Sequence, residues 1–180
     1  MGKIIFILGG VRSGKSSYAI ELAKNLKDKT AFIATCVLPD SEMRKRIKVH
    51  KKSRPRHWKV VEEGRDIGSC LANLKNEYET ILVDCLGLWI SNLLAENLTD
   101  KKIEREIKNF AKFISRLKAN IILVSNEVGS GIVPDNLLAR RFRDLLGLAN
   151  QIMAKKADEV IFMQAGIPLI IKKGVRRFFK

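Results

Sequence analysis

The sequence predicts an α/β fold of three layers, in which helices cover both faces of a mostly parallel central sheet. Short apolar runs rich in β-branched residues alternate along the chain with longer segments of helical periodicity. These runs are apolar throughout, as in strands that are buried on both faces. Strands separated by helices pair in parallel. Because 46% of the 180 residues are hydrophobic, which is enough for one core, we expect a single domain over residues 1–180.

The elements of the first half of the chain begin with the apolar run at 4–8. The segment after it has apolar residues at helical spacing, which predicts a helix over 15–26. The remaining elements are predicted from the same two patterns. Strands are expected at 31–34, 58–61 and 80–84, and helices at 40–52, 67–74 and 88–98.

The second half contains the clearest amphipathic helix, at 103–117, which leads into a strand at 121–124. Pro134 is expected in the first turn of a long helix, where its missing N–H costs nothing. The apolar side of that helix includes Leu138, Phe142, Leu145, Ala149, Ile152 and Met153. The last strands are expected at 160–163 and 169–171.

A phosphate-binding loop follows the first predicted strand and opens the first predicted helix. The run Gly9-Gly10-Val11-Arg12-Ser13-Gly14-Lys15-Ser16 matches the Walker A pattern. Its glycines let backbone N–H groups surround phosphate oxygens at a helix N-terminus. Lys15 is expected to reach the β- and γ-phosphates, and the Ser16 hydroxyl to ligate Mg²⁺. The flanking strand and helix make an ordinary glycine turn the weaker interpretation, so we predict a P-loop NTPase (RecA-like) fold.

Asp84 ends another buried strand, and it is the expected partner of Ser16 at the Mg²⁺ site, directly or through water. The alternative role for Asp84 is to cap the following helix.

The formal charge of +15, from 34 Lys+Arg against 19 Asp+Glu, favours anionic partners. No aromatic residues alternate with the basic ones as a stacking platform for nucleic acid requires, and no nucleic acid is expected. No apolar stretch approaches the roughly 20 residues of a membrane span, and the N-terminus does not read as a signal peptide. Cys36, Cys70 and Cys85 lack paired spacing, so we expect a cytoplasmic protein with buried, reduced thiols.

Four further segments give the chain a resemblance to a known family. They are Arg46–Trp58, which contains R-I-x-x-H before Arg-Pro, Asp84-Cys85-Leu86, Asn126–Pro134, and Arg140–Gln151. Together with the phosphate loop they resemble the bifunctional adenosylcobinamide kinase / adenosylcobinamide-phosphate guanylyltransferase family, from about Ile4 to Lys172. Four motifs in the right order are far more specific than a Walker A pattern alone.

The resemblance implies a set of site residues. The histidine that carries GMP falls on His50 and not on His57. The GTP contacts fall on Gly9, Gly10, Val11, Arg12, Ser13, Gly14, Lys15 and Ser16, on Thr35, Cys36 and Val37, on Lys51, Lys52, Ser53 and Arg54, and on Glu62 and Asp84. Relatives often have more polar side chains at Cys36 and Val37, so backbone contacts are expected there.

The chemistry of His50 agrees with that role, because a neutral imidazole can attack the α-phosphorus of GTP, expel pyrophosphate and hold GMP as a phosphoramidate. Neighbouring cations at Lys51, Lys52 and Arg54 offset phosphate charge and lower the imidazole pKa. Spacing alone favours a histidine that only packs on a helix with Met43 and Ile47 or lies on a solvated basic face. The resemblance reverses that preference.

The resemblance also implies two reactions at one nucleotide site. These are phosphorylation of adenosylcobinamide by ATP or GTP and transfer of GMP to adenosylcobinamide phosphate, with Mg²⁺ required in both and a homotrimer as the assembly. Two alternatives stay open: a monofunctional P-loop kinase of another small alcohol, and a basic nucleic-acid-binding NTPase. The loop Asn126–Val133 is expected to face substrate or the γ-phosphate, while Glu127 is equally suited to bracing that loop. Arg140, Arg143 and Asp144 are candidates for contact with substrate or with a neighbouring subunit.

Overall fold

The computed structural model describes residues 2–26, 29–36 and 54–174. Its strands are β1 (Ile4–Gly9), β2 (Thr30–Ala34), β3 (Lys59–Glu62), β4 (Thr80–Asp84), β5 (Asn120–Asn126), β6 (Glu159–Gln164) and β7 (Ile167–Lys173). Its helices are α1 (Lys15–Leu26), α3 (Ile67–Leu74), α4 (Leu86–Ala95), α5 (Asp100–Ile114) and α6 (Leu137–Lys156). The helix predicted at 40–52 lies outside the described residues.

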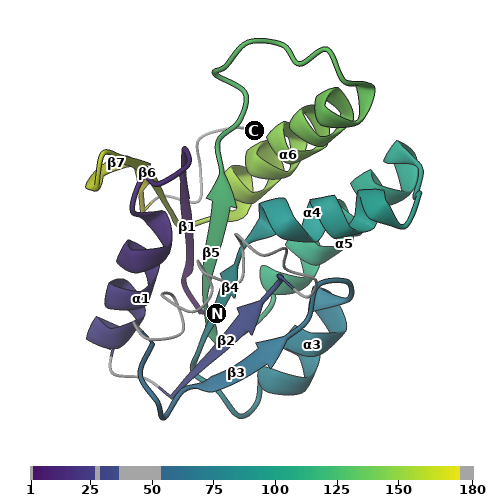
Figure 1. Ribbon diagram of the computed structural model, residues 1–180. Helices are drawn as coiled ribbons and strands as arrows, with labels where there is room; N and C mark the ends of the chain where they lie inside the picture. Colours follow the sequence, from purple (N-terminus) through teal and green to yellow (C-terminus); the bar gives the residue numbers. More distant parts are fainter. Residues whose placement is uncertain (1, 27–28, 37–53, 175–180) are drawn as a thin grey trace.

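One seven-stranded sheet runs through the molecule in the order β3-β2-β4-β5-β1-β6-β7. Every neighbouring pair is parallel except β6 and β7, which form an antiparallel hairpin. The helices α3 to α6 lie on one side of the sheet and α1 on the other (Figure 1). The predicted three-layer α/β fold with a mostly parallel sheet is therefore confirmed.

Strand β1 shows how the core is divided by the sheet. Ile4 and Phe6 belong to the large cluster under α3 to α6, whereas Ile5 and Ile7 belong to the smaller cluster under α1. This alternation follows from the two-residue period of a strand. Both sets are buried, which is why the strand reads as an unbroken apolar run rather than an alternating one.

Helix α6 begins later than the sequence predicts. Pro134 was expected in its first turn, but the helix starts at Leu137 and the cap is Asn136, whose side chain accepts a hydrogen bond from the N–H of Ala139 at 3.1 Å. An asparagine cap satisfies an N–H that the first turn leaves unpaired. Pro134 therefore lies in the β5–α6 loop, and its prediction as a helix residue is wrong.

Two further expectations about burial are corrected. Leu138 was placed on the core side of α6, but it is exposed, because the helix extends beyond the edge of the sheet at its first turn. Cys85 is buried, whereas Cys36 and Cys70 are only half-buried, so the expectation of buried thiols holds for one of the three. In the described part of the chain, no helix is long and apolar enough to span a membrane.

Asn150 joins α6 to the sheet through two hydrogen bonds inside the protein. Its Oδ1 accepts from the hydroxyl of Ser125 at 2.6 Å, and its Nδ2 donates to the carbonyl of Asn126 at 3.0 Å. Asn150 and Ser125 are both buried. The pair of bonds fixes the height of α6 against the end of β5, where the β5–α6 loop begins.

We predict that Asn150→Ala lowers the free energy of unfolding by about 1–3 kcal/mol, because it leaves a buried hydroxyl and a backbone carbonyl without their partner. The measurement is urea unfolding followed by circular dichroism. The neighbouring Gln151 is exposed, so Gln151→Ala is the matched control and should change stability by no more than about 0.5 kcal/mol. Equal effects of the two substitutions would contradict the bridging role of Asn150.

Candidate nucleotide-binding site

The phosphate loop connects the end of β1 to the start of α1. Three backbone hydrogen bonds hold it: Gly10 accepts from the N–H of Ser13 at 3.3 Å, Gly9 accepts from the N–H of Glu127 at 3.0 Å, and Ser13 accepts from the N–H of Gly166 at 3.0 Å. The loop is thereby attached to the end of β5 and to the turn between β6 and β7. Its shape is set before any phosphate binds.

Two residues of the loop have left-handed backbone conformations. Gly14 has φ +88°, which glycine adopts without steric cost, while Arg12 has φ +54°. A Cβ on Gly14 would also come within 3.3 Å of Cα of Gly166. The side chains of Val11 and Arg12 are exposed, whereas Ser13 is buried and its hydroxyl has no hydrogen-bond partner within the described ranges.

Lys15 lies half-buried at the first position of α1, and its Nζ donates to the carbonyl of Gly10 at 3.0 Å. Burial lowers the pKa of Lys15, and the negative charge of nearby Asp84 opposes that shift. Burial also raises the pKa of Cys85 to about 12. The Cys85 thiol is therefore neutral near pH 7, and Asp84 supplies the negative charge next to the lysine.

Thr35 joins the segment after β2 to the segment after β4 through hydrogen bonds. Its Oγ1 accepts from the N–H of Cys85 at 2.7 Å and donates to the carbonyl of Cys85 at 2.8 Å, and its own N–H donates to the carbonyl of Asp84 at 3.1 Å. The Asp84–Cys85 peptide bond is cis. The Thr35 side chain is fully buried. Its hydroxyl is thus used inside the protein, and a nucleotide contact through that hydroxyl stays a prediction.

Arg54, which precedes β3, adds a cation to the site. Its guanidinium carbon lies 3.6 Å from the centroid of the Phe32 ring, which is a cation–π arrangement. Burial lowers the pKa of Arg54, and the negative charges of Asp84 and Glu62 oppose that shift. Arg54 is therefore placed electrostatically between the carboxylates that end β3 and β4.

The structure brings together most of the described residues that the sequence assigned to the nucleotide. The carboxyl ends of β1, β2, β3 and β4 contribute the phosphate loop, Thr35 with Cys36, Glu62 and Asp84, and Arg54 joins them. Cys36 is half-buried and Glu62 exposed. Val37, His50, Lys51, Lys52 and Ser53 lie outside the described residues.

Asn92 and Phe32 were missed by the sequence analysis. Asn92 Nδ2 donates to the carbonyls of Thr35 and Gly64, each at 2.9 Å, so α4 holds the ends of β2 and β3 in place. An asparagine inside an otherwise apolar helix was the available signal, because asparagine is disfavoured in helix interiors. Phe32 carried no signal, since a buried aromatic residue is ordinary core.

The chemistry of Ser16 and Asp84 fits Mg²⁺. Ser16 is half-buried in the first turn of α1, and Asp84 ends β4 beside Lys15. Magnesium prefers oxygen ligands and is commonly held by one or two protein groups together with substrate phosphates and water. Asp84 does not cap α4, because the cap position is Cys85. No group of three or more His, Cys, Asp and Glu suited to a metal occurs among the residues the structure describes.

Side-chain hydrogen bonds from the loop itself and from α6 stabilise the β5–α6 loop, residues 127–136. Glu127 Oε1 accepts hydrogen bonds from the N–H groups of Gly129 and Ser130. Arg143 donates to the carbonyl of Gly129 at 2.8 Å, and Arg140 donates to the carbonyls of Pro134 and Asp135 at 2.8 and 2.6 Å. The bracing role that the sequence left open for Glu127 is confirmed.

Comparison with known proteins gives a family match along nearly the whole chain. Residues 5–171 match the CobU family, described as "Cobinamide kinase / cobinamide phosphate guanyltransferase". The bifunctional adenosylcobalamin biosynthesis protein CobP of Pseudomonas aeruginosa is 39% identical over 92% of this chain and 95% of its own. The proteins named CobU of Escherichia coli and Salmonella typhimurium are 36% and 38% identical, each over 94% of this chain and 99% of its own.

The fold also has a neighbour among solved structures. The flagellar accessory protein FlaH of Methanocaldococcus jannaschii superimposes with a TM-score of 0.53 and 16% identity, over 96% of this chain and 79% of its own. At that identity the likeness concerns the fold alone. The strand order, with β5 between the phosphate-loop strand β1 and the Asp84 strand β4, together with this likeness supports the RecA-like fold that the sequence predicts.

We predict that Gly9→Ala destabilises the ligand-free protein by about 1–3 kcal/mol, as overpacking against fixed backbone does. A Cβ at Gly9 would lie 2.5 Å from the carbonyl oxygen of Met163 and 2.7 Å from Oγ of Ser13. A Cβ at Gly10 would meet nothing within 4 Å, so Gly10→Ala is the matched control. Chemical unfolding of both variants tests this, and comparable stabilities of the two would refute the close-packing explanation.

Proposed function

The chain belongs to the cobinamide kinase / cobinamide phosphate guanyltransferase family, and we propose that the phosphate-loop end of its sheet performs both reactions of that family. The observation that carries this proposal is the placement of Lys15 and Asp84 together at a strand-loop-helix phosphate site. That site lies in a chain matched to the family over residues 5–171. Family membership argues against the two alternatives, a kinase of another alcohol and a nucleic-acid-binding NTPase.

The first reaction is a phosphoryl transfer. The aminopropanol hydroxyl of adenosylcobinamide attacks the γ-phosphorus of ATP or GTP, the hydroxyl proton passes to water, and the nucleoside diphosphate leaves. Lys15 places a positive charge beside the transferring group, where negative charge spreads over the phosphate oxygens. Half-burial of Lys15 strengthens this interaction, because fewer water molecules compete for the charge.

The second reaction passes through His50. The neutral imidazole attacks the α-phosphorus of GTP, pyrophosphate leaves, and GMP is held on the ring nitrogen. The phosphate of adenosylcobinamide phosphate then attacks that phosphorus, which releases the histidine and gives adenosylcobinamide-GDP. His50 lies outside the described residues. Covalent connectivity supports its role, because four residues span at most about 14 Å and Arg54 belongs to the site.

The nucleotide is held by the residues that the family resemblance assigns. Arg54 supplies a cation between Glu62 and Asp84, and Lys51 and Lys52 are proposed to offset phosphate charge together with it. Thr35, Cys36, Val37 and Ser53 complete the proposed contacts. The residues 9–16 surround the phosphates.

Mg²⁺ is the proposed cofactor, with Ser16 and Asp84 as its protein ligands. When bound, the ion neutralises phosphate charge. Asp84 also orients Lys15 electrostatically.

We propose that the protein forms a homotrimer and is located in the cytoplasm. Support for self-association comes from β7, an edge strand with exposed apolar residues. Such edges are usually covered in natural proteins. The exposed residues are Ile167, Leu169, Ile170 and Ile171.

We predict that incubation with GTP labels the protein only when the isotope is on the α-phosphate, and that this label is stable to alkali and labile to acid, as a phosphoramidate is. His50→Asn should abolish the label. His57 is exposed and has no assigned role, so His57→Asn is the matched control and should retain it. Label on the His50→Asn protein would eliminate the assigned nucleophile.

We predict that Lys15→Ala lowers the kinase rate roughly 100-fold or more, the usual cost of removing one preorganised group that stabilises a transition state. The assay is phosphate transfer from γ-labelled ATP to cobinamide. Lys24 lies on the same helix in an exposed ion pair with Glu21, so Lys24→Ala should leave the rate nearly unchanged. His50→Asn should keep kinase activity, and its loss there would show that the two reactions are not separable.

A further inference from the structure

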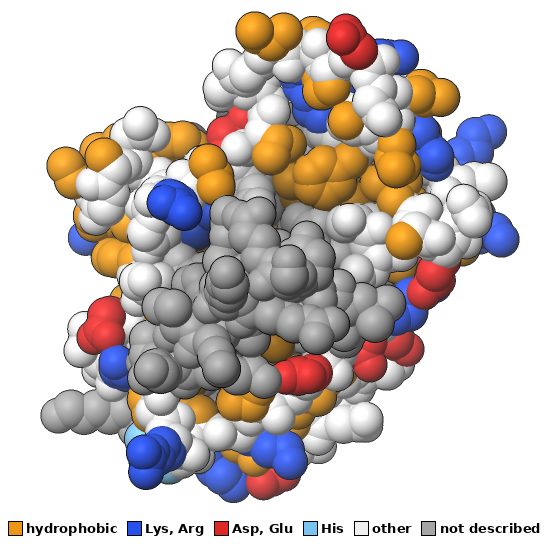
Figure 2. All heavy atoms as spheres, in the orientation of Figure 1, with side chains coloured by type: hydrophobic (Ala, Val, Ile, Leu, Met, Phe, Trp, Pro, Cys, Tyr) orange, Lys and Arg blue, Asp and Glu red, His pale blue; other side chains and the backbone are white. Residues whose placement is uncertain are grey.

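Four large apolar side chains are exposed close together at the phosphate-loop end of the sheet. We call them the apolar shelf: Ile132 is 96% exposed, Val133 61%, Leu137 66% and Leu138 54%. Single exposed apolar residues are ordinary, but a contiguous group marks a binding surface. Figure 2 shows hydrophobic side chains gathered over the β5–α6 loop and α6, at the top of this face of the molecule.

The shelf continues the core outward along α6. Leu138 lies one turn before Phe142, which is half-buried against the core cluster that contains Leu145. Apolar residues recur at helical spacing along the whole of α6, which is the pattern of a helix covered over its full length. In the structure the cover ends before Leu138, so the first turn of α6 presents an apolar surface that the described residues leave open.

The backbone under the shelf is fixed. Arg140 bonds to the carbonyls of Pro134 and Asp135, and Asn136 caps α6. Farther back, Arg143 holds Gly129. Exposed apolar side chains on a backbone held by this many polar contacts are preorganised to bind, since little ordering is left to complete on association.

The shelf is also tied to the phosphate loop. The N–H of Glu127 donates to the carbonyl of Gly9 at 3.0 Å. Ile132 is five positions beyond Glu127, so the chain keeps their Cα atoms within about 18 Å of each other. The proposed acceptor has to bring its hydroxyl to this end of the sheet, which places its apolar ring next to the shelf.

We propose that the apolar shelf binds the corrin macrocycle of the acceptor. This inference rests on the proposed function. A corrin ring carries methyl groups around an apolar framework, and its hydroxyl arm must reach the γ-phosphate while the ring stays outside the phosphate loop. Ile132, Val133, Leu137 and Leu138 cover the ring's apolar surface, and the exposed Asp135 between them accepts hydrogen bonds from its peripheral amides. The shelf thereby sets specificity for a corrinoid among alcohols.

The test compares Ile132→Ser and Leu138→Ser with Leu26→Ser, which removes an exposed apolar side chain at the far end of α1. Equilibrium dialysis with cobinamide gives the dissociation constant, and the kinase assay gives KM for cobinamide. Each shelf variant should weaken cobinamide binding roughly tenfold, as expected for one apolar side chain that loses its contact. The control should bind like the unchanged protein.

GTP-dependent labelling of the protein needs no corrinoid, and it should be equal in all variants. Cobinamide affinity unchanged in both shelf variants would overturn the shelf proposal while leaving the proposed function intact. A change of oligomeric state in the shelf variants, measured by light scattering, would instead identify the shelf as a subunit interface and also overturn the proposal. Absence of both kinase activity and label in the unchanged protein would refute the proposed function and the shelf together.

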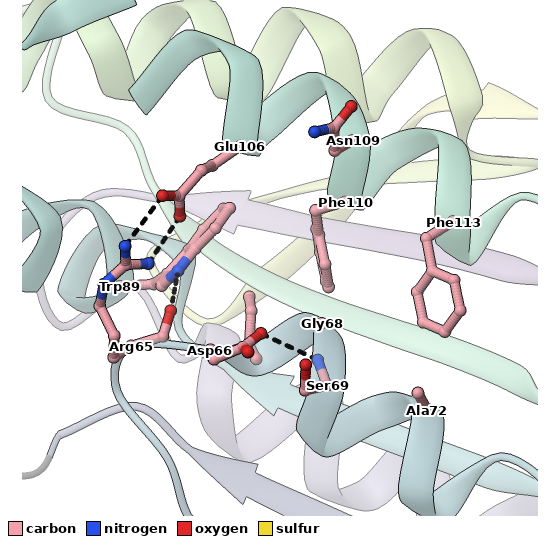
Figure 3. Close-up of a pocket in the computed structure, with 11 residues that line it drawn as sticks. Arg65, Asp66, Gly68, Ser69, Ala72, Trp89, Glu106, Asn109, Phe110 and Phe113 are labelled. Carbon is pink, nitrogen blue, oxygen red and sulfur yellow. Dashed lines mark hydrogen bonds and ion pairs between the residues drawn. The ribbon is translucent and has the colours of Figure 1, made fainter. Parts of the chain in front are cut away.

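A cavity of about 690 Å³ between α3, α4 and α5 carries no such proposal (Figure 3). Its most prominent polar group, Arg65, is engaged by Glu106 in a two-bond ion pair and by Glu96 at 2.6 Å. The Arg65 carbonyl accepts from the indole N–H of Trp89. Figure 3 shows Glu106 and Trp89 turned toward Arg65, so these groups hold the segment before α3 against α4 and α5.

Discussion

The parallel register of the central strands is the constraint on which the site depends. Ala34 on β2 lies opposite Glu62 on β3 and Asp84 on β4, and Gly9 on β1 lies opposite Asn126 on β5. Because these strands point the same way, the residues that follow each of them emerge at one edge of the sheet. A phosphate loop, two carboxylates and the β5–α6 loop are thereby placed side by side at that edge.

Within that edge, Asp84 connects the phosphate end of the site to the Arg54 end. Its negative charge acts on Lys15 and on Arg54, both of them half-buried cations. Such charges interact more strongly in a partly buried site than in water. The backbone on either side of Asp84 is fixed by Thr35, and the carbonyl of Thr35 is in turn held by Asn92. Buried hydrogen bonds thus fix the position of the Asp84 carboxylate. Its negative charge then interacts with the two cations nearby.

The β5–α6 loop differs from the rest of this edge. Its polar groups form hydrogen bonds within the loop, and its apolar side chains face outward. Glu127, Arg140 and Arg143 satisfy backbone N–H and carbonyl groups. This arrangement stabilises an exposed loop and leaves Ile132 and Leu138 uncovered. The chain has a net charge of +15, but Arg140 and Arg143 donate to backbone carbonyls of this loop. The surface that the loop exposes is therefore apolar.

The sequence by itself determined the fold class, nearly all the described strands and helices, and the phosphate loop, because burial on both faces, helical periodicity and a glycine pattern are local properties of the chain. It also predicted a site role for Asp84 from its place at the end of a buried strand, and one for Glu62 through the family resemblance. The placement of β5 between β1 and β4, the late start of α6 at Leu137 and the stacking of Arg54 on Phe32 were decided by the tertiary structure. Strand order and side-chain partners depend on which segments meet in space, and the periodicity of a single segment contains no information about that.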